Sequence, residues 1–253
     1  MLLVRRFIPY LLGLVIIAGM LLAAFVPVFI WPAFVVGAII IAFAIWLLSD
    51  NKLNLEFLNS LVTPLIFYMV VFLFTLFLES AVLKIIFPLV AAFLVLVYTE
   101  QLFYYRYFDR KYQANALENL SFYMVILSIF FLASSLFGFY IFLHAPKALL
   151  LVVTVLVILV LNYQLFWVLK VNFWESWPYN TVLTLAAFEF FYVLTFLPTS
   201  FAVNGAMLAI LYYFTLGLLR YHFIDRLDKK VLKRYLIIGS IMLMFVAFTA
   251  RWT

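Results

Sequence analysis

The stretch from Ala148 to Val168 reads ALLLVVTVLVILVLNYQLFWV and contains no charged residue. A helix needs about 20 mostly apolar residues to cross about 30 Å of hydrocarbon. In lipid the backbone N–H and C=O groups have no water to bond, so they must pair within the segment, and this favours a helix. This stretch therefore predicts one transmembrane helix.

Eight further stretches meet the same criterion, and residues typical of turns separate them. The sequence thus predicts an all-α, polytopic transmembrane helix bundle of about nine spans. Eight spans remain an alternative if the first two stretches form a re-entrant hairpin, because the Pro27–Pro32 connection is short and uncharged. The prolines lie near the predicted ends, so we expect no broken helices. The eight stretches are Phe7–Val26, Val28–Leu48, Leu61–Leu78, Ile85–Leu102, Leu120–Leu143, Tyr179–Leu197, Phe201–Leu219 and Tyr235–Trp252.

The composition excludes a water-soluble fold, because 70% of the residues are apolar and only 10% are charged. Soluble domains are about half apolar and about a quarter charged. We therefore expect a single transmembrane domain over residues 1–253. The first apolar stretch is too long for a cleavable signal peptide and continues directly into the second, so it is interpreted as a retained helix.

The basic residues predict the orientation, because Lys and Arg concentrate in cytoplasmic loops. With the N-terminus in the cytoplasm and the C-terminus outside, 13 of the 16 Lys and Arg residues fall on the inner side. The three on the outer side are Lys84, Lys147 and Arg251. This distribution predicts a multi-pass protein of a plasma membrane or a bacterial inner membrane.

Three sequence matches recur at nearly one offset and suggest an internal duplication. Each pair falls at the same place in a four-helix period, which predicts two parallel repeat units, 1–111 and 112–230, followed by a final helix at 235–252. Chance similarity between hydrophobic segments is the alternative. The pairs are Lys52-Leu-Asn-Leu-Glu56 with Lys170-Val-Asn-Phe-Trp-Glu175, Asn59–Thr63 with Asn180–Thr184, and Asp109-Arg110 with Asp225-Arg226.

Glu189 lies near the centre of the seventh predicted span. An ionised side chain at that depth costs about 2.5–3.5 kcal/mol on insertion scales, so we expect Glu189 to be protonated and to face protein or water. Tyr192 could donate to it locally. A proton-coupled carrier needs such a carboxyl, but we favour the simpler interpretation that Glu189 hydrogen-bonds a serine, threonine or tyrosine between helices. The expected partners at this depth are Ser128, Ser134 and Thr154.

Asn162 and Gln164 lie in the inner third of the sixth span. They could line a cavity open to the cytoplasm, but amide side chains also commonly join helices in membranes. We therefore favour a structural role for both residues.

The segment from Arg220 to Arg234 is the most basic part of the chain. Phe223, Ile224, Leu227 and Val231 share one helical face, which predicts an amphipathic helix in the cytoplasmic interface. The residues expected to contact anionic headgroups are Arg226, Lys229, Lys230, Lys233 and Arg234. A topogenic role for the same charges is compatible with this, and nucleic-acid binding is not expected.

Two classes of function follow. The first is a noncatalytic membrane component or scaffold that contacts anionic lipid, a membrane-protein partner or a second copy. The second is a small proton-coupled or lipid-handling carrier that uses Glu189. An enzyme is less favoured, because no catalytic motif is present. The chain lacks cysteine, and His144 and His222 lie on opposite sides, so we expect no metal site and no cofactor.

Overall fold

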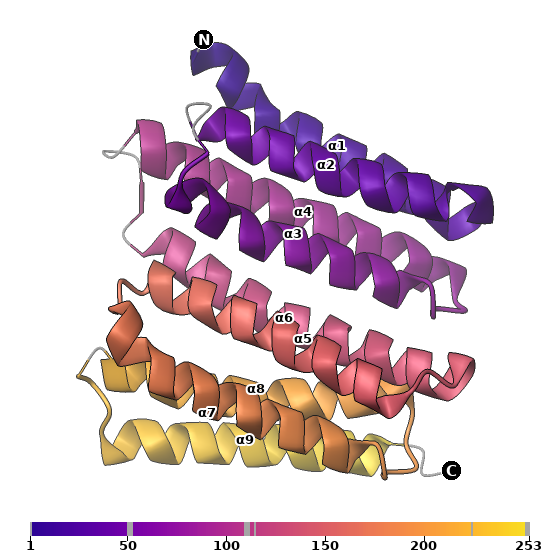
Figure 1. Ribbon diagram of the computed structural model, residues 1–253, viewed down its shortest axis with the longest axis vertical. Helices are drawn as coiled ribbons and strands as arrows, with labels where there is room; N and C mark the ends of the chain where they lie inside the picture. Colours follow the sequence, from indigo (N-terminus) through magenta and orange to yellow (C-terminus); the bar gives the residue numbers. More distant parts are fainter. Residues whose placement is uncertain (1, 50–52, 109–111, 114, 224, 251–253) are drawn as a thin grey trace. The chain divides into compact units, whose positions relative to one another are not determined.

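The computed structural model describes all residues except 1, 50–52, 109–111, 114, 224 and 251–253, and it describes side chains from Arg5 onward. Over these residues it contains no strand, and every regular element is a helix (Figure 1). The predicted all-α architecture is confirmed. The elements are α1 (Leu2–Phe25), the short 3-10 helix η1 (Pro27–Phe29), α2 (Ile30–Leu48), α3 (Leu55–Thr75), α4 (Ala81–Tyr107), α5 (Ala116–Leu143), α6 (Lys147–Val168), α7 (Phe173–Leu194), α8 (Phe201–Phe223) and α9 (Lys229–Thr249).

Eight of these helices are long and apolar enough to cross a membrane, which is the pattern of a multi-pass membrane protein. The exception is α7, and not the α1–α2 pair that the eight-span alternative concerned. Although α7 has 22 residues, Glu175, Asn180 and Glu189 lower its mean hydropathy. It nevertheless packs against both α6 and α8. The ninth predicted span, at α7, therefore stays a prediction.

Several helices extend beyond the predicted apolar stretches at the predicted cytoplasmic end. For example, α3 begins at Leu55 instead of Leu61, and α9 begins at Lys229 instead of Tyr235. Side-chain caps start both helices. Asn54 accepts a hydrogen bond of 2.9 Å from the Phe57 N–H, and Asp228 accepts one of 2.8 Å from Val231. Hydropathy does not detect these extensions, because capping acts through polar residues.

The expectation that proline avoids the middle of the helices is wrong for Pro64, which lies inside α3. Proline lacks the N–H that would bond the carbonyl four residues earlier. That carbonyl belongs to Ser60, and the buried Tyr98 hydroxyl donates a hydrogen bond of 3.1 Å to it from α4. The neighbouring helix therefore replaces the backbone donor that α3 lacks.

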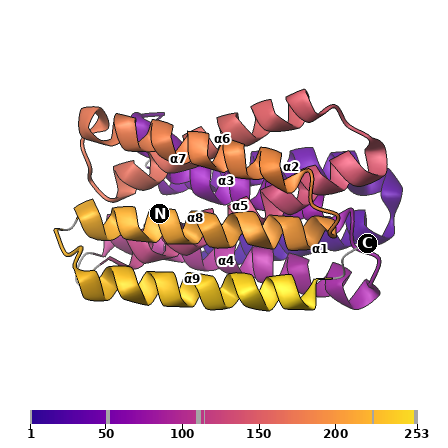
Figure 2. The same cartoon turned by 90° about the horizontal axis from the view of Figure 1, so that it is seen from below.

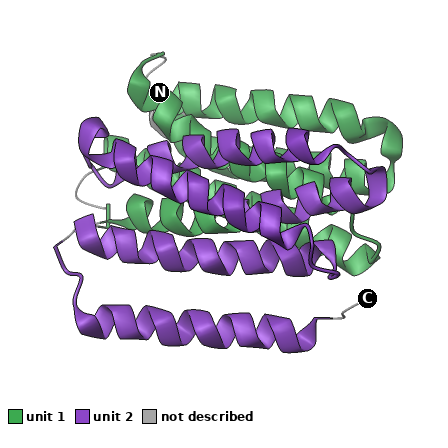
Figure 3. Ribbon diagram, turned by 60° about the horizontal axis from the view of Figure 1, so that its bottom comes forward, with its two compact units in different colours: residues 1–128 green, residues 129–253 purple. Residues whose placement is uncertain are grey.

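Internal contacts divide the chain into two compact units, Met1–Ser128 and Ile129–Thr253 (Figure 3). The boundary falls within α5 instead of at residue 111, where the proposed repeat divides. Asn54 and Asn172, which the repeat aligns, each precede a helix, α3 and α7 respectively. This equivalence is what a duplication would produce, and the duplication stays a prediction.

Close helix packing in unit 1 depends on a glycine. Gly37 in α2 lies directly beneath the Tyr68 side chain of α3, and an added Cβ would overlap that ring. The Tyr68 hydroxyl in turn donates a hydrogen bond of 2.8 Å to the Ala33 carbonyl. Gly37 and Ile41, one turn later on α2, are both buried.

In unit 2 the core combines aromatic stacking with a second close approach. Phe137 and Phe191 stack with ring centroids 4.5 Å apart, and both are 1% exposed. A Cβ on Gly205 would lie 2.8 Å from the Ser134 backbone nitrogen and 3.0 Å from the Phe130 carbonyl oxygen. The last helix, α9, lies beside α8 in both Figure 1 and Figure 2.

Candidate functional site

A chain of polar side chains joins α6, α7 and α8 within unit 2. The Tyr212 hydroxyl donates to Asn162 Oδ1, and Asn162 Nδ2 donates over 3.3 Å to Thr184 Oγ1. The Thr184 hydroxyl donates over 3.3 Å to Asn180 Oδ1, and Asn180 Nδ2 donates over 3.4 Å to the Leu159 carbonyl. All four side chains are almost fully buried. The network is therefore a sequence of donors that ends on a backbone carbonyl.

This network is suited to holding helices together and not to moving protons. A proton relay needs groups that accept a proton on one side and release one on the other, as hydroxyl, carboxyl and imidazole groups do. The amides of Asn162 and Asn180 keep their protons and interrupt such a relay. The structural role that we favoured for Asn162 is consistent with this arrangement.

Gln164 is also fully buried, but it does not join the network. Neither its Nε2 nor its Oε1 has a hydrogen-bond partner in the described part of the chain. An unpartnered buried amide costs about 1–3 kcal/mol. The structure therefore places Asn162 and Gln164 in different environments, although only two positions separate them.

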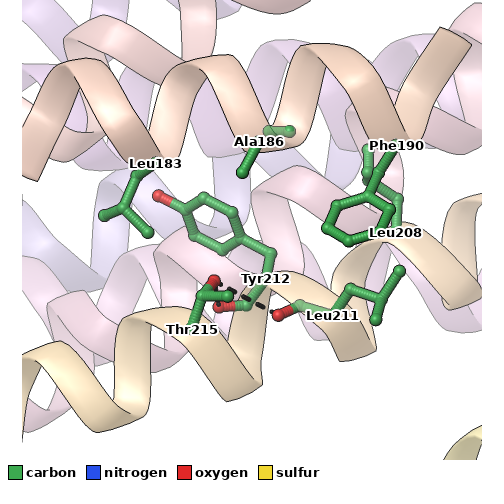
Figure 4. A pocket seen from close by; sticks show the side chains of 8 residues that line it. Leu183, Ala186, Phe190, Leu208, Leu211, Tyr212 and Thr215 are labelled. Carbon is green, nitrogen blue, oxygen red and sulfur yellow. Dashed lines mark hydrogen bonds between the residues drawn. The ribbon is translucent and has the colours of Figure 1, made fainter.

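A small cavity lies between α7 and α8, next to the network. Its volume is about 10 Å³, which is near the minimum for a single water molecule. Figure 4 shows the Tyr212 ring beside Leu183 and Ala186, and Thr215 bonded to backbone oxygens of its own helix. The space between these two helices is too small for an organic substrate.

Two larger grooves open on the outside of the units. The groove between α6 and α7 has a volume of about 240 Å³ and includes Leu159, Asn180 and Thr184 in its lining. The groove between α1 and α4 has a volume of about 450 Å³ and is lined mainly by apolar residues. Both grooves are open and have apolar walls, which suits lipid chains.

Glu189 is not where the sequence analysis expected it. Because α7 ends at Leu194, Glu189 lies about 7.5 Å from the end of the helix and not at its centre. Its side chain is exposed and does not face the other helices. Within the described residues no hydrogen bond or ion pair reaches it. The expected partners Ser128 and Thr154 bond carbonyls of their own helices, those of Met124 and Leu150.

Tyr192 shares the exposed face of α7 with Glu189 and is 45% exposed. The local hydrogen bond that we expected between the two side chains is not present. The Tyr192 ring packs edge-on against Phe196 at 5.2 Å, and its hydroxyl has no partner among the residues the structure describes. An acceptor and a donor are therefore both left unpaired on one apolar face.

The basic segment does not form the predicted separate amphipathic helix. Helix α8 continues to Phe223 and α9 begins at Lys229, while Ile224 lies outside the described residues. The two flanking helices explain this difference. The end of α8 and the start of α9 include most of the segment, so few residues remain for a separate helix. The basic side chains are all exposed, and none forms an ion pair within the described chain: Arg226, Lys229, Lys230, Lys233 and Arg234.

Sequence reasoning missed a second polar cluster, at the predicted inner end of unit 1. Arg106 Nη2 approaches Ser60 Oγ at 3.5 Å, while its Nε has no partner. Asn59 Nδ2 and Thr63 Oγ1 are also buried without described partners. The predicted repeat aligned Asn59–Thr63 with Asn180–Thr184 of the unit 2 network. This match is the feature of the sequence that could have indicated the cluster.

Tyrosines at the end of α4 and shortly after it join helix ends within unit 1. The Tyr112 hydroxyl accepts a hydrogen bond of 3.0 Å from the Leu117 N–H at the start of α5. Burial raises the pKa of Tyr112. Earlier in the same region, the Tyr107 hydroxyl accepts a hydrogen bond from Arg5 and donates one to the Leu48 carbonyl. These tyrosines fasten helix ends together.

No group of three or more His, Asp or Glu side chains that could hold a metal ion occurs in the part of the chain with described positions. Comparison with known proteins adds no functional assignment, because no family model, curated protein or solved structure matches the chain. The site must therefore be interpreted from its own geometry.

Proposed function

We propose that this chain is a noncatalytic membrane component whose basic end binds anionic lipid headgroups. The observation that carries the proposal is the placement of cations at the start of α9. Lys229, Lys230 and Lys233 occupy the first turns of this helix, together with Arg234. Their side chains are exposed and lack described acidic partners.

These charges work against the helix that carries them. A helix N-terminus has a partial positive charge, so each nearby cation is unfavourable by about 0.3–1 kcal/mol. Asp228 offsets part of this cost as the N-cap. Anionic headgroups would offset the remainder, because each basic residue near such a surface contributes about 1 kcal/mol.

Binding of phosphatidylglycerol, measured by native mass spectrometry of the purified protein, tests the proposal. A variant with Lys229, Lys230 and Lys233 changed to glutamine should bind at least about tenfold more weakly, since about 1 kcal/mol per residue is about fivefold each. The control changes Lys84 and Lys147, which the predicted topology places on the outer side, to glutamine. The proposal would be rejected if both variants lost affinity equally or if neither lost any.

A lipid-handling carrier that uses Glu189 is the second candidate. It is supported by the α6–α7 groove, whose lining includes Leu185, one helical turn before Glu189 on the same helix. A lipid in this groove could reach the carboxyl. The proton-coupled form of this hypothesis is less supported, because amides interrupt the polar network. Lipid exchange between vesicles that depends on Glu189 would favour the carrier.

A further inference from the structure

The exposed face of α7 contains two polar groups that have no partner among the described residues. The carboxyl of Glu189 is an acceptor, and the hydroxyl of Tyr192, three residues later, is a donor. Neighbouring residues of this face are apolar and exposed, with Leu185 at 52% and Val193 at 58%. Polar groups within a membrane are expected to face protein or water instead of lipid.

The unit itself does not cover this face. The α7 residues that pack inward are on the opposite side, including the buried Leu183, Ala187 and Phe191. The hydrogen-bonding capacity of Glu189 and Tyr192 is therefore available to a molecule outside the chain. A membrane neighbour that brings one donor and one acceptor at the same depth would satisfy both groups.

We propose that this face of α7 is the interface of a homodimer, in which Glu189 of each copy accepts a hydrogen bond from Tyr192 of the other. The face is self-complementary, because it carries one acceptor and one donor, and a two-fold contact pairs them twice. Any two copies of a membrane protein with one topology share their orientation, so the two-fold axis runs along the membrane normal and residues meet at equal depth.

The spacing of the two residues suits this pairing. Glu189 and Tyr192 differ in depth by about 4.5 Å at 1.5 Å per residue. Long side chains of a helix lean toward its N-terminus, and because tyrosine is longer than glutamate, the Tyr192 hydroxyl can approach the level of the Glu189 carboxyl of the other copy. Leu185 and Val193, one turn to either side of Glu189, would pack against their counterparts in the second copy.

Disulfide trapping provides the first test, because the chain contains no native cysteine. Single Leu185→Cys and Val193→Cys variants in native-like membranes should form covalent dimers on mild oxidation. The control is Leu156→Cys, which is 59% exposed on α6. Dimer formation that is no faster at Leu185 and Val193 than at Leu156 would overturn the proposal, as would trapping of a different protein in place of a second copy.

Dimer dissociation in bilayers, followed by energy transfer between labelled copies, tests the hydrogen bonds themselves. Tyr192→Phe and Glu189→Leu should each weaken dimerisation by at least about tenfold, because each removes two symmetric bonds. Glu189→Gln should retain the dimer, since the amide oxygen still accepts. Unchanged dimerisation in Tyr192→Phe, or complete loss in Glu189→Gln, contradicts the proposed pairing. The inference does not rest on headgroup binding at α9, and neither result decides the other.

Discussion

The Tyr98 hydroxyl donates to the Ser60 carbonyl, which Pro64 leaves without a donor inside α3. We predict that Tyr98→Phe lowers the free energy of unfolding by about 1–3 kcal/mol, because the buried carbonyl then has no partner. In a Pro64→Ala background the alanine N–H can bond Ser60, so the same substitution should cost less. A double-mutant cycle measured by equilibrium unfolding in mixed micelles checks this. Equal costs in both backgrounds would show that the bond does not compensate for the proline.

Removal of the side-chain amide of Asn162 and of Gln164, which both lie on α6, should have opposite effects on stability. Asn162→Ala leaves the Tyr212 hydroxyl without its acceptor and removes one of the two hydrogen bonds of Thr184. We therefore expect a loss of stability of about 2–4 kcal/mol from the hydrogen bonds and the cavity. Gln164→Leu replaces an amide that has no partner. It should be neutral or stabilising, because the chain then buries no unsatisfied group at this site. Thermal unfolding of the two purified variants distinguishes them, and a larger loss for Gln164→Leu would be incompatible with the network.

Close packing makes a specific prediction for two glycines of unit 2. A methyl group on Gly205 would overlap the Ser134 side chain and crowd backbone atoms, and we expect Gly205→Ala to destabilise by about 1–3 kcal/mol. Gly239 is the control, because its Cβ would have no neighbour nearer than Phe214 at 3.7 Å. Gly239→Ala should be neutral or stabilising by up to about 1 kcal/mol. The comparison requires only the two thermal midpoints, and similar midpoints would mean that α5 and α8 are not this closely packed.

Substitution of Glu189 should have little effect on the folding of the monomer. Because the side chain is exposed and has no described partner, Glu189→Gln should change the unfolding free energy of the monomer by no more than about 0.5 kcal/mol. The measurement is unfolding in detergent at protein concentrations that keep the chain monomeric. A loss above about 2 kcal/mol would instead show that Glu189 has a partner inside the fold.

Hydropathy was sufficient to predict the helices, because all the long ones except α7 contain an apolar stretch of membrane length. Their ends were less predictable, since caps such as Asn54 and Asp228 extend α3 and α9 into the polar interface. The place of Glu189 along its helix was also misjudged, because α7 runs from Phe173 to Leu194 instead of from Tyr179 to Leu197. Proline inside α3 was also missed, because the predicted span began only at Leu61, close to Pro64.

The sequence also could not show which side of a transmembrane helix packs against the other helices. In a soluble helix the polar side indicates the exposed face, but α7 carries apolar residues on both sides. Nothing in the sequence therefore told whether Glu189 faces protein or lipid. The partners of Asn162 depend on which helices are neighbours, and Thr184 and Tyr212 lie 22 and 50 residues away.

Whether α7 crosses the membrane is the most direct test of the nine-span arrangement, because this helix fixes the sides of everything that follows it. Single cysteines at Asn172 and Ser200, on either side of α7, can be labelled with a membrane-impermeant maleimide in intact cells. We predict that Ser200→Cys reacts directly, whereas Asn172→Cys reacts only after the cells are permeabilised. Reaction of both positions from the same side would contradict the account.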